Sequence, residues 1–180
     1  MVLEILGTRI LAPSLGTTIE VWSAIITIIL VSIAAGYFFG GALADKKQKS
    51  WILPAILLSS AFFVMLISFL KTLVLETFLT FPYGIRALWY SASLFMLPAF
   101  FLGSSTTYII RNQIKKIHSV GSVNGKIYGI STVGSLLGVY TTSFYLVPTF
   151  AISSIITGLA ALLFCTAFIS FLNQPTSWED

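Results

Sequence analysis

Charged residues are scarce in this chain. Only 9% of its 180 residues are Asp, Glu, Lys or Arg, while 57% are hydrophobic and the mean hydropathy is +0.96. A soluble domain carries roughly 25% charged residues. This chain cannot cover a water-facing surface, so we predict an integral membrane protein whose main partner is the lipid bilayer. The net charge of +4 does not indicate nucleic-acid binding, because the basic residues lie between the apolar runs.

Cysteine and histidine are almost absent. Cys165 and His118 are the single examples, which excludes an intrachain disulfide, a cysteine metal site and any site with several histidines. The sequence also lacks a phosphate-cradling loop followed by Lys-Ser or Lys-Thr. We therefore predict no catalytic residues, no metal site and no cofactor, and we do not expect the chain to act alone as an enzyme.

Long uncharged runs are what the chain has instead. A run of about 20 apolar residues can cross a bilayer as a helix. Such runs cover residues 21–44, 51–70, 87–110 and 127–178, and the last divides at Val147-Pro148-Thr149. The apolar stretch 1–11 is too short to span alone. These runs predict an all-α membrane bundle of about six transmembrane helices over residues 1–172, followed by a short polar tail at 173–180.

The segments between the runs give more detail. We expect a turn at 12–16, and a helix extension followed by an interfacial loop at 71–86. Pro98 interrupts the third long run and predicts a kink near mid-membrane. Hydroxyl side chains at 104–107 are candidates to satisfy the backbone that the proline frees.

Basic residues set the predicted orientation. Segments 45–50 and 111–126 hold seven of the ten Lys and Arg residues, and one hairpin separates them. Lysine and arginine accumulate in cytoplasmic loops of membrane proteins. Both segments are therefore predicted to be cytoplasmic, with the Pro148 turn outside and the C-terminus inside.

Glycines recur at a spacing of four on two predicted helices. Gly36 and Gly40 share one helix face, where a neighbouring backbone can approach closely. A second series comprises Gly125, Gly129, Gly134 and Gly138. Close helix packing and a backbone-lined pathway both remain open for this second series.

Several motifs resemble known membrane proteins. The stretch Gly41-x-Leu43-Ala44-Asp45-Lys46 is similar to the loop between the second and third helices of major facilitator transporters. Further matches run from Glu4-x-x-Gly7-Thr8-Arg9, through Tyr108-x-Ile110-Arg111 and Gly134-Ser-Leu-Leu-Gly138, to Val147-Pro148. Together they resemble the membrane half of the fused major-facilitator/spermidine-synthase family. The resemblance implies a fold like half of a major facilitator transporter.

The sequence departs from that family at several points. Lys47-Gln48 stands where the loop pattern has a glycine, Thr107 where a proline is common, and Ala151 where a glycine is common. The soluble aminopropyltransferase-like domain of the family has no counterpart in these 180 residues. Aminopropyl transfer therefore cannot be assigned to any residue here.

The resemblance also implies structural or gating roles for certain residues. These are Gly36, Gly40, Gly41, Asp45, Arg111, Gly134 and Gly138. Asp45 is expected to pair with a basic residue of the second basic segment, such as Arg111. In the alternative interpretation, Asp45 is an ordinary acidic residue at a helix end, close to lysines.

Glu4 and Arg9 are ionisable groups in an apolar stretch, and such groups in spans are often functional. In one interpretation they bind substrate, with Glu4 facing a cavity and attracting a cation. In the other, Glu4 pairs with a backbone or a neighbouring helix while Arg9 extends to the outer interface.

Two functions remain open. One is binding or transport of a small, polyamine-related solute by a half-transporter, which would have to form a homodimer because such transporters pair two six-helix halves. The other is a membrane anchor for a separate soluble aminopropyltransferase-like protein. Either would place the chain in the plasma membrane of a prokaryote.

Overall fold

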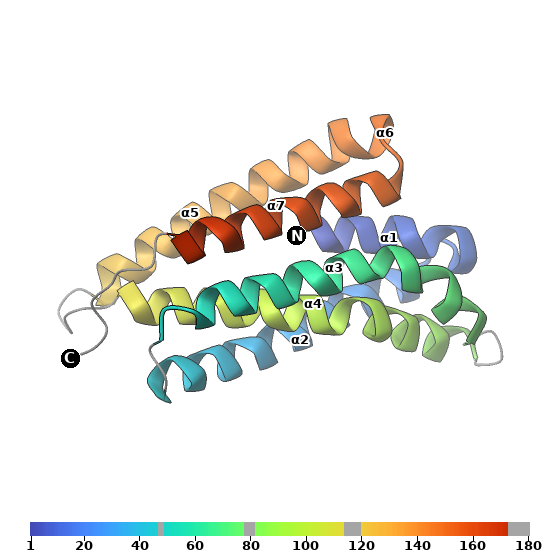
Figure 1. Ribbon diagram of the computed structural model, residues 1–180. Helices are drawn as coiled ribbons and strands as arrows, with labels where there is room; N and C mark the ends of the chain where they lie inside the picture. Colours follow the sequence, from blue (N-terminus) through green and yellow to red (C-terminus); the bar gives the residue numbers. More distant parts are fainter. Residues whose placement is uncertain (47–48, 78–81, 114–119, 173–180) are drawn as a thin grey trace.

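The computed structural model describes residues 1–46, 49–77, 82–113 and 120–172 (Figure 1). Over these residues every regular element is helical, and five helices are long and apolar enough to cross a membrane. The long elements are α2 (Ile19–Lys46), α3 (Ile52–Thr77), α4 (Tyr83–Gln113), α5 (Val120–Thr141) and α7 (Ile152–Leu172). The expected all-α membrane bundle is confirmed.

The first helix is short and lies inside the bundle. Helix α1 (Val2–Leu15) has 14 residues, about 21 Å at 1.5 Å per residue, against a hydrocarbon core of about 30 Å. The turn predicted at 12–16 is placed too early, because α1 continues through Pro13 to Leu15. It ends where Gly16 takes a positive φ of 72°, a conformation that glycine adopts without a steric penalty.

The connecting segments are more helical than predicted. Helix α3 does extend past residue 70, to Thr77, but α4 already begins at Tyr83, where the Pro82 carbonyl accepts a hydrogen bond from the Arg86 amide. Helices α4 and α5 likewise enter the segment 111–126 from both sides. No glycine or proline lies between Gly103 and Gly121 to stop α4 earlier. Lys47, residues 114–119 with His118, and the tail 173–180 fall outside the described residues.

The last long run, 127–178, divides close to the predicted point. A π-helical turn, η2 (Thr142–Leu146), and a short helix, α6 (Val147–Thr149), follow α5 directly. Phe150 then adopts an extended conformation before α7 begins. The break thus lies one residue beyond the predicted Val147-Pro148-Thr149 turn, since proline is tolerated in the first turn of α6.

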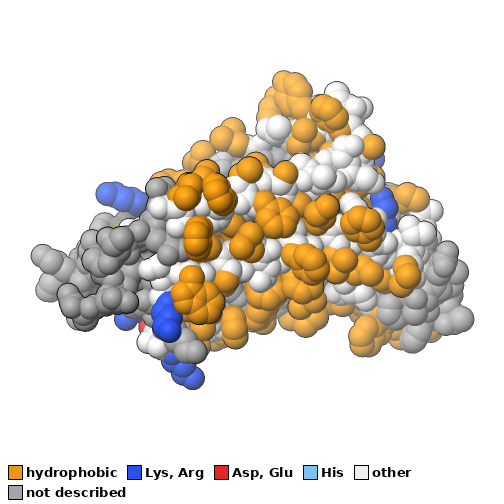
Figure 2. All heavy atoms as spheres, viewed as in Figure 1, with side chains coloured by type: hydrophobic (Ala, Val, Ile, Leu, Met, Phe, Trp, Pro, Cys, Tyr) orange, Lys and Arg blue, Asp and Glu red, His pale blue; other side chains and the backbone are white. Residues whose placement is uncertain are grey.

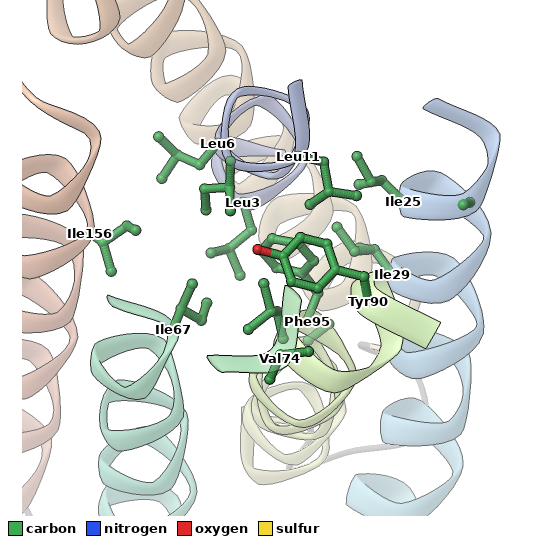
Figure 3. Packing of buried hydrophobic residues seen from close by; sticks show 14 of the residues in the cluster. Leu3, Leu6, Leu11, Ile25, Ile29, Ile67, Val74, Tyr90, Phe95 and Ile156 are labelled. Atoms are coloured by element: carbon green, nitrogen blue, oxygen red, sulfur yellow. The ribbon is translucent and has the colours of Figure 1, made fainter. Parts of the chain in front are cut away.

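Helices α1, α2, α3, α4 and α7 pack around one hydrophobic core. Helix α2 packs on α4, α4 on α3, and α3 on α7, while α1 touches α2, α4 and α7. Side chains from all five helices meet in one cluster, which Figure 3 shows around Leu6, Leu11, Ile25, Phe95 and Ile156. Leu6, Leu11, Ile25 and Phe95 are fully buried.

Helix α5 is the exception to this packing. Only 6% of its apolar window is buried, against 28% to 39% in the other four spans. Figure 1 shows α5 and α6 at one edge of the bundle, beyond α7. A single chain therefore leaves most of α5 uncovered.

Candidate functional site

The tightest helix contact joins α2 and α4. A Cβ atom on Gly36 would collide with the carbonyl oxygen of Phe100, and one on Gly40 with the backbone of Ser104. Gly103 of α4 completes the contact, because its Cβ would lie 2.6 Å from the carbonyl oxygen of Ile33. The close approach predicted at Gly36 and Gly40 is confirmed. The sequence reasoning did not assign Gly103 a packing role, although a small residue in the facing helix is the usual partner of such a pair.

The other glycines behave differently. A Cβ on Gly41, Gly125, Gly129 or Gly134 would meet nothing within 4 Å, and one on Gly138 would meet only a methyl group of Val2, at 3.1 Å. Close packing is therefore wrong for Gly125, Gly129 and Gly134 within a single chain, whereas Gly138 packs closely against the Val2 side chain of α1. The physical reason is the position of α5 at the edge of the bundle, where its glycines have no neighbouring backbone.

An ion pair joins the ends of α2 and α4. Arg111 Nε lies 2.8 Å from Asp45 Oδ1, so the pairing implied by the resemblance is present. Both side chains are solvent-accessible, at 45% and 67% exposure. Figure 2 shows Lys and Arg side chains at the two ends of the molecule and hydrophobic side chains between them, as a bilayer-spanning chain requires.

Pro98 does not interrupt α4, which is one helix from Tyr83 to Gln113. The hydroxyls of Ser104 and Ser105 donate to the carbonyls of Phe100 and Leu102. Those carbonyls lie after the proline, whereas a proline frees the carbonyl four residues before it. The predicted role of these hydroxyls in satisfying that carbonyl is therefore wrong.

Glu4 and Arg9 are not brought together. They lie five positions apart on α1, so they do not occupy one face. The Glu4 carboxylate is largely buried, with 17% exposure, and lies 3.8 Å from the amino nitrogen of Met1. Arg9 is exposed and lines a cavity together with Lys71 and Tyr90, a cavity to which Glu4 does not contribute.

An apolar groove lies beside α5. It has a volume of about 530 Å³ and lies between α5–η2 on one side and α7 on the other. Its walls include Gly138, Leu146, Leu159 and Leu162, with Thr142 and Ser154 as hydroxyl-bearing residues. Sequence reasoning missed this groove, because it depends on the separation of two helices that are neighbours along the chain.

No group of three or more His, Cys, Asp or Glu residues gathers anywhere in the described part of the chain. Cys165, which lies in a wholly apolar run, is exposed on α7, as a lipid-facing residue would be. Comparisons with protein-family models, curated proteins and solved structures found no match. The fold thus defines the class of the protein, a multi-pass α-helical integral membrane protein.

Proposed function

We propose that the chain is a small-solute binding or transport module that works as a pair, with two copies meeting along α5. The observation that carries this proposal is the combination of polarity and exposure on α5. The span containing it has a mean hydropathy of 1.3, close to the 1.4 of the α4 span and below the 2.1 to 2.4 of the other three, but it is much less buried than α4, at 6% against 39%. A span that its own chain leaves uncovered would normally be the most apolar one.

Several exposed side chains on α5 carry hydroxyl groups. Tyr128 and Tyr140 are about half exposed, and Ser131 is exposed between them. The hydroxyl of the neighbouring Thr132 donates to the Tyr128 carbonyl, so it is already compensated. Polar groups facing lipid lose their hydration without compensation. A second copy, or a water-filled path between two copies, removes that cost. The open surface around Gly134 would let the backbone of a second copy approach closely.

The solute we propose is a small polyamine-related cation, the class that the family resemblance implies. Glu4 is the candidate counter-charge, because it is the one acid of the apolar stretch 1–11 and its side chain is only 17% exposed. Arg9 lies outside this proposed cation site. We place the module in a prokaryotic plasma membrane, with the basic segments and C-terminus in the cytoplasm.

Disulfide cross-linking tests the pairing. In a Cys165→Ser background, Gly134→Cys should form a covalent dimer on oxidation in membranes. Phe38→Cys is the control, because Phe38 is 82% exposed but lies on α2, away from α5. Equal cross-linking of both variants, or of neither, would contradict a dimer along α5.

Uptake of spermidine into vesicles tests the solute. Glu4→Gln keeps the shape and removes the charge, so it should abolish saturable uptake while the protein stays folded. Glu20→Gln is the matched control, since Glu20 is exposed in the first turn of α2. A wild-type protein without saturable polyamine binding would reject this solute.

The charged end of the bundle favours a second candidate function. Lys46, Lys49 and the Asp45–Arg111 pair lie where α2 and α4 end. Such a surface could dock a soluble protein, and the anchor proposal assigns it to an aminopropyltransferase-like partner. Co-purification of such a partner in mild detergent, together with absent polyamine uptake, would make the anchor the better proposal.

A further inference from the structure

Two basic side chains from distant parts of the sequence face one small cavity. The cavity has a volume of about 210 Å³, with Arg9 from α1 and Lys71 from α3 in its walls. Ser14, Thr72 and Tyr90 add hydroxyl-bearing side chains. No acidic residue lines it.

The positive charges in this cavity are not neutralised within the described chain. Neither Arg9 nor Lys71 forms an ion pair with a described carboxylate. The side chain of Lys71 donates instead to the hydroxyl of Ser153, over 2.8 Å. Two like charges beside a low-dielectric interior raise the free energy of the fold unless an anion lies between them.

Helix α7 adds a third positive contribution. It begins at Ile152, which also lines the cavity, and Ser153 is its second residue. The N-terminus of a long helix carries a partial positive charge that favours anions and disfavours cations. Lys71 nevertheless lies there, held to Ser153. A negative group in the cavity would interact favourably with both Lys71 and the start of α7.

A hydrogen bond from Tyr90 of α4 holds the backbone of α3 in place at Lys71. The buried Tyr90 hydroxyl donates to the carbonyl oxygen of Lys71. Lys71 lies three residues before the end of the span Ile52–Val74, about 4.5 Å along the helix axis. The cavity lies at the end of the bundle opposite the Asp45–Arg111 pair. Its position near the end of this span leads us to expect it at the depth where lipid headgroups meet the hydrocarbon core.

We propose that this cavity binds a phosphate-type oxyanion. The Arg9 guanidinium would bind two oxygens through its planar fork, and the Lys71 ammonium would supply a point charge. The group would be the phosphate of an anionic lipid headgroup or a free phosphate. Lysine and arginine normally accumulate in cytoplasmic loops, yet three basic residues lie outside the predicted cytoplasmic segments. An anion site would give two of these three, Arg9 and Lys71, a function.

This site is independent of the proposed cation transport. A polyamine carries the same sign of charge as Arg9 and Lys71, so it would be repelled from this cavity. Failure of the polyamine experiments therefore leaves the anion site untouched, and the reverse also holds.

Native mass spectrometry tests the lipid source. Protein released from nanodiscs of mixed phosphatidylglycerol and phosphatidylcholine should retain phosphatidylglycerol selectively. Arg9→Gln and Lys71→Gln should each lower this retention about tenfold, as expected when a charge-assisted hydrogen bond is lost. Lys126→Gln is the control, because it removes one exposed positive charge near the start of α5, away from the cavity.

A titration with inorganic phosphate tests the free-anion source. In pure phosphatidylcholine nanodiscs, saturable thermal stabilisation by phosphate, lost in Arg9→Gln, would support a free ligand. Lys71→Arg should keep most of the binding, and Arg9→Lys should keep more than Arg9→Gln but less than the wild type because lysine lacks the planar fork. This order separates loss of charge from misfolding. Absence of both lipid retention and phosphate stabilisation, or equal losses in Lys126→Gln, would overturn the proposal.

Discussion

Arg111 Nε donates a hydrogen bond to Asp45 Oδ1 over 2.8 Å, and this contact ties the last turn of α4 to the last turn of α2. An acid is unfavourable at a helix C-terminus, where the helix dipole is negative, and a cation is favourable there. Arg111 therefore compensates both helix ends at once. The pair is exposed, so its contribution to stability is small.

A double-mutant cycle over this pair gives the first prediction. Asp45→Asn and Arg111→Gln should show a coupling of about 0.5 kcal/mol in thermal unfolding in detergent, shrinking at high salt. Lys126→Gln with Asp45→Asn should show no coupling. A coupling unchanged between low and high salt would contradict a solvent-screened pair.

Glycine-to-alanine substitutions give the second prediction. Gly40→Ala should destabilise the fold by about 1–3 kcal/mol, because the added methyl group meets the backbone of Ser104. Gly41→Ala is the matched neighbour, since open space surrounds its Cβ position. It should be neutral, or stabilising by up to about 1 kcal/mol, because alanine is the better helix former. Similar melting temperatures for both variants would contradict the close α2–α4 contact.

The third prediction concerns Gly134, which faces open space on α5. Gly134→Leu should leave the melting temperature of the monomer in detergent unchanged and weaken self-association in membranes. Analytical ultracentrifugation in detergent and cross-linking in membranes measure the two effects. A lower melting temperature of the monomer would mean that α5 packs within its own chain.

The fourth prediction concerns the core. Phe95→Ala should cost only about 1–2 kcal/mol, less than the same change in a soluble core. In a soluble protein the cost includes the lost transfer of the side chain from water to the core. That contribution is small here because lipid is already apolar, so the cost comes mainly from the cavity that the substitution leaves. Phe38→Ala, at a residue that is 82% exposed, should have little effect. Equal unfolding temperatures of the two variants would contradict the assigned core.

The fifth prediction tests the orientation. In a Cys165→Ser background, single cysteines at Gln48 and Ser119 should resist an impermeant thiol reagent in intact cells. A cysteine at the exposed Thr17, between α1 and α2, should react. The reverse labelling pattern would invert the topology.

The spans and the α2–α4 contact could be predicted from the sequence because each depends on local information. The length of an apolar run sets a span, and the spacing of Gly36 and Gly40 sets a contact face. Helix ends were less predictable. The start of α4 at Tyr83 depends on the Pro82 carbonyl, which accepts a hydrogen bond, and the end of α1 at Leu15 depends on the conformation of Gly16. A glycine spacing cannot show whether a neighbour is present, which is why Gly36 and Gly134 behave differently.

The two cavities could not be predicted for the same reason. Arg9 and Lys71 are unremarkable near the ends of apolar runs until two helices bring them to one cavity. Likewise the groove between α5 and α7 depends on tertiary packing rather than on any motif. The sequence indicated ionisable candidates such as Arg9, but not their partners.

The packing of α7 on α3 also constrains how the chain is made. Helix α7 ends almost 100 residues after α3 does, which at 5–20 residues per second corresponds to about 5–20 s of synthesis. During that interval the α3 surface that will receive α7 faces lipid or the insertion machinery. The Lys71–Ser153 hydrogen bond can form only after α7 arrives. The contact between α3 and α7 thus forms late, and until α7 has been made that α3 surface lacks its partner.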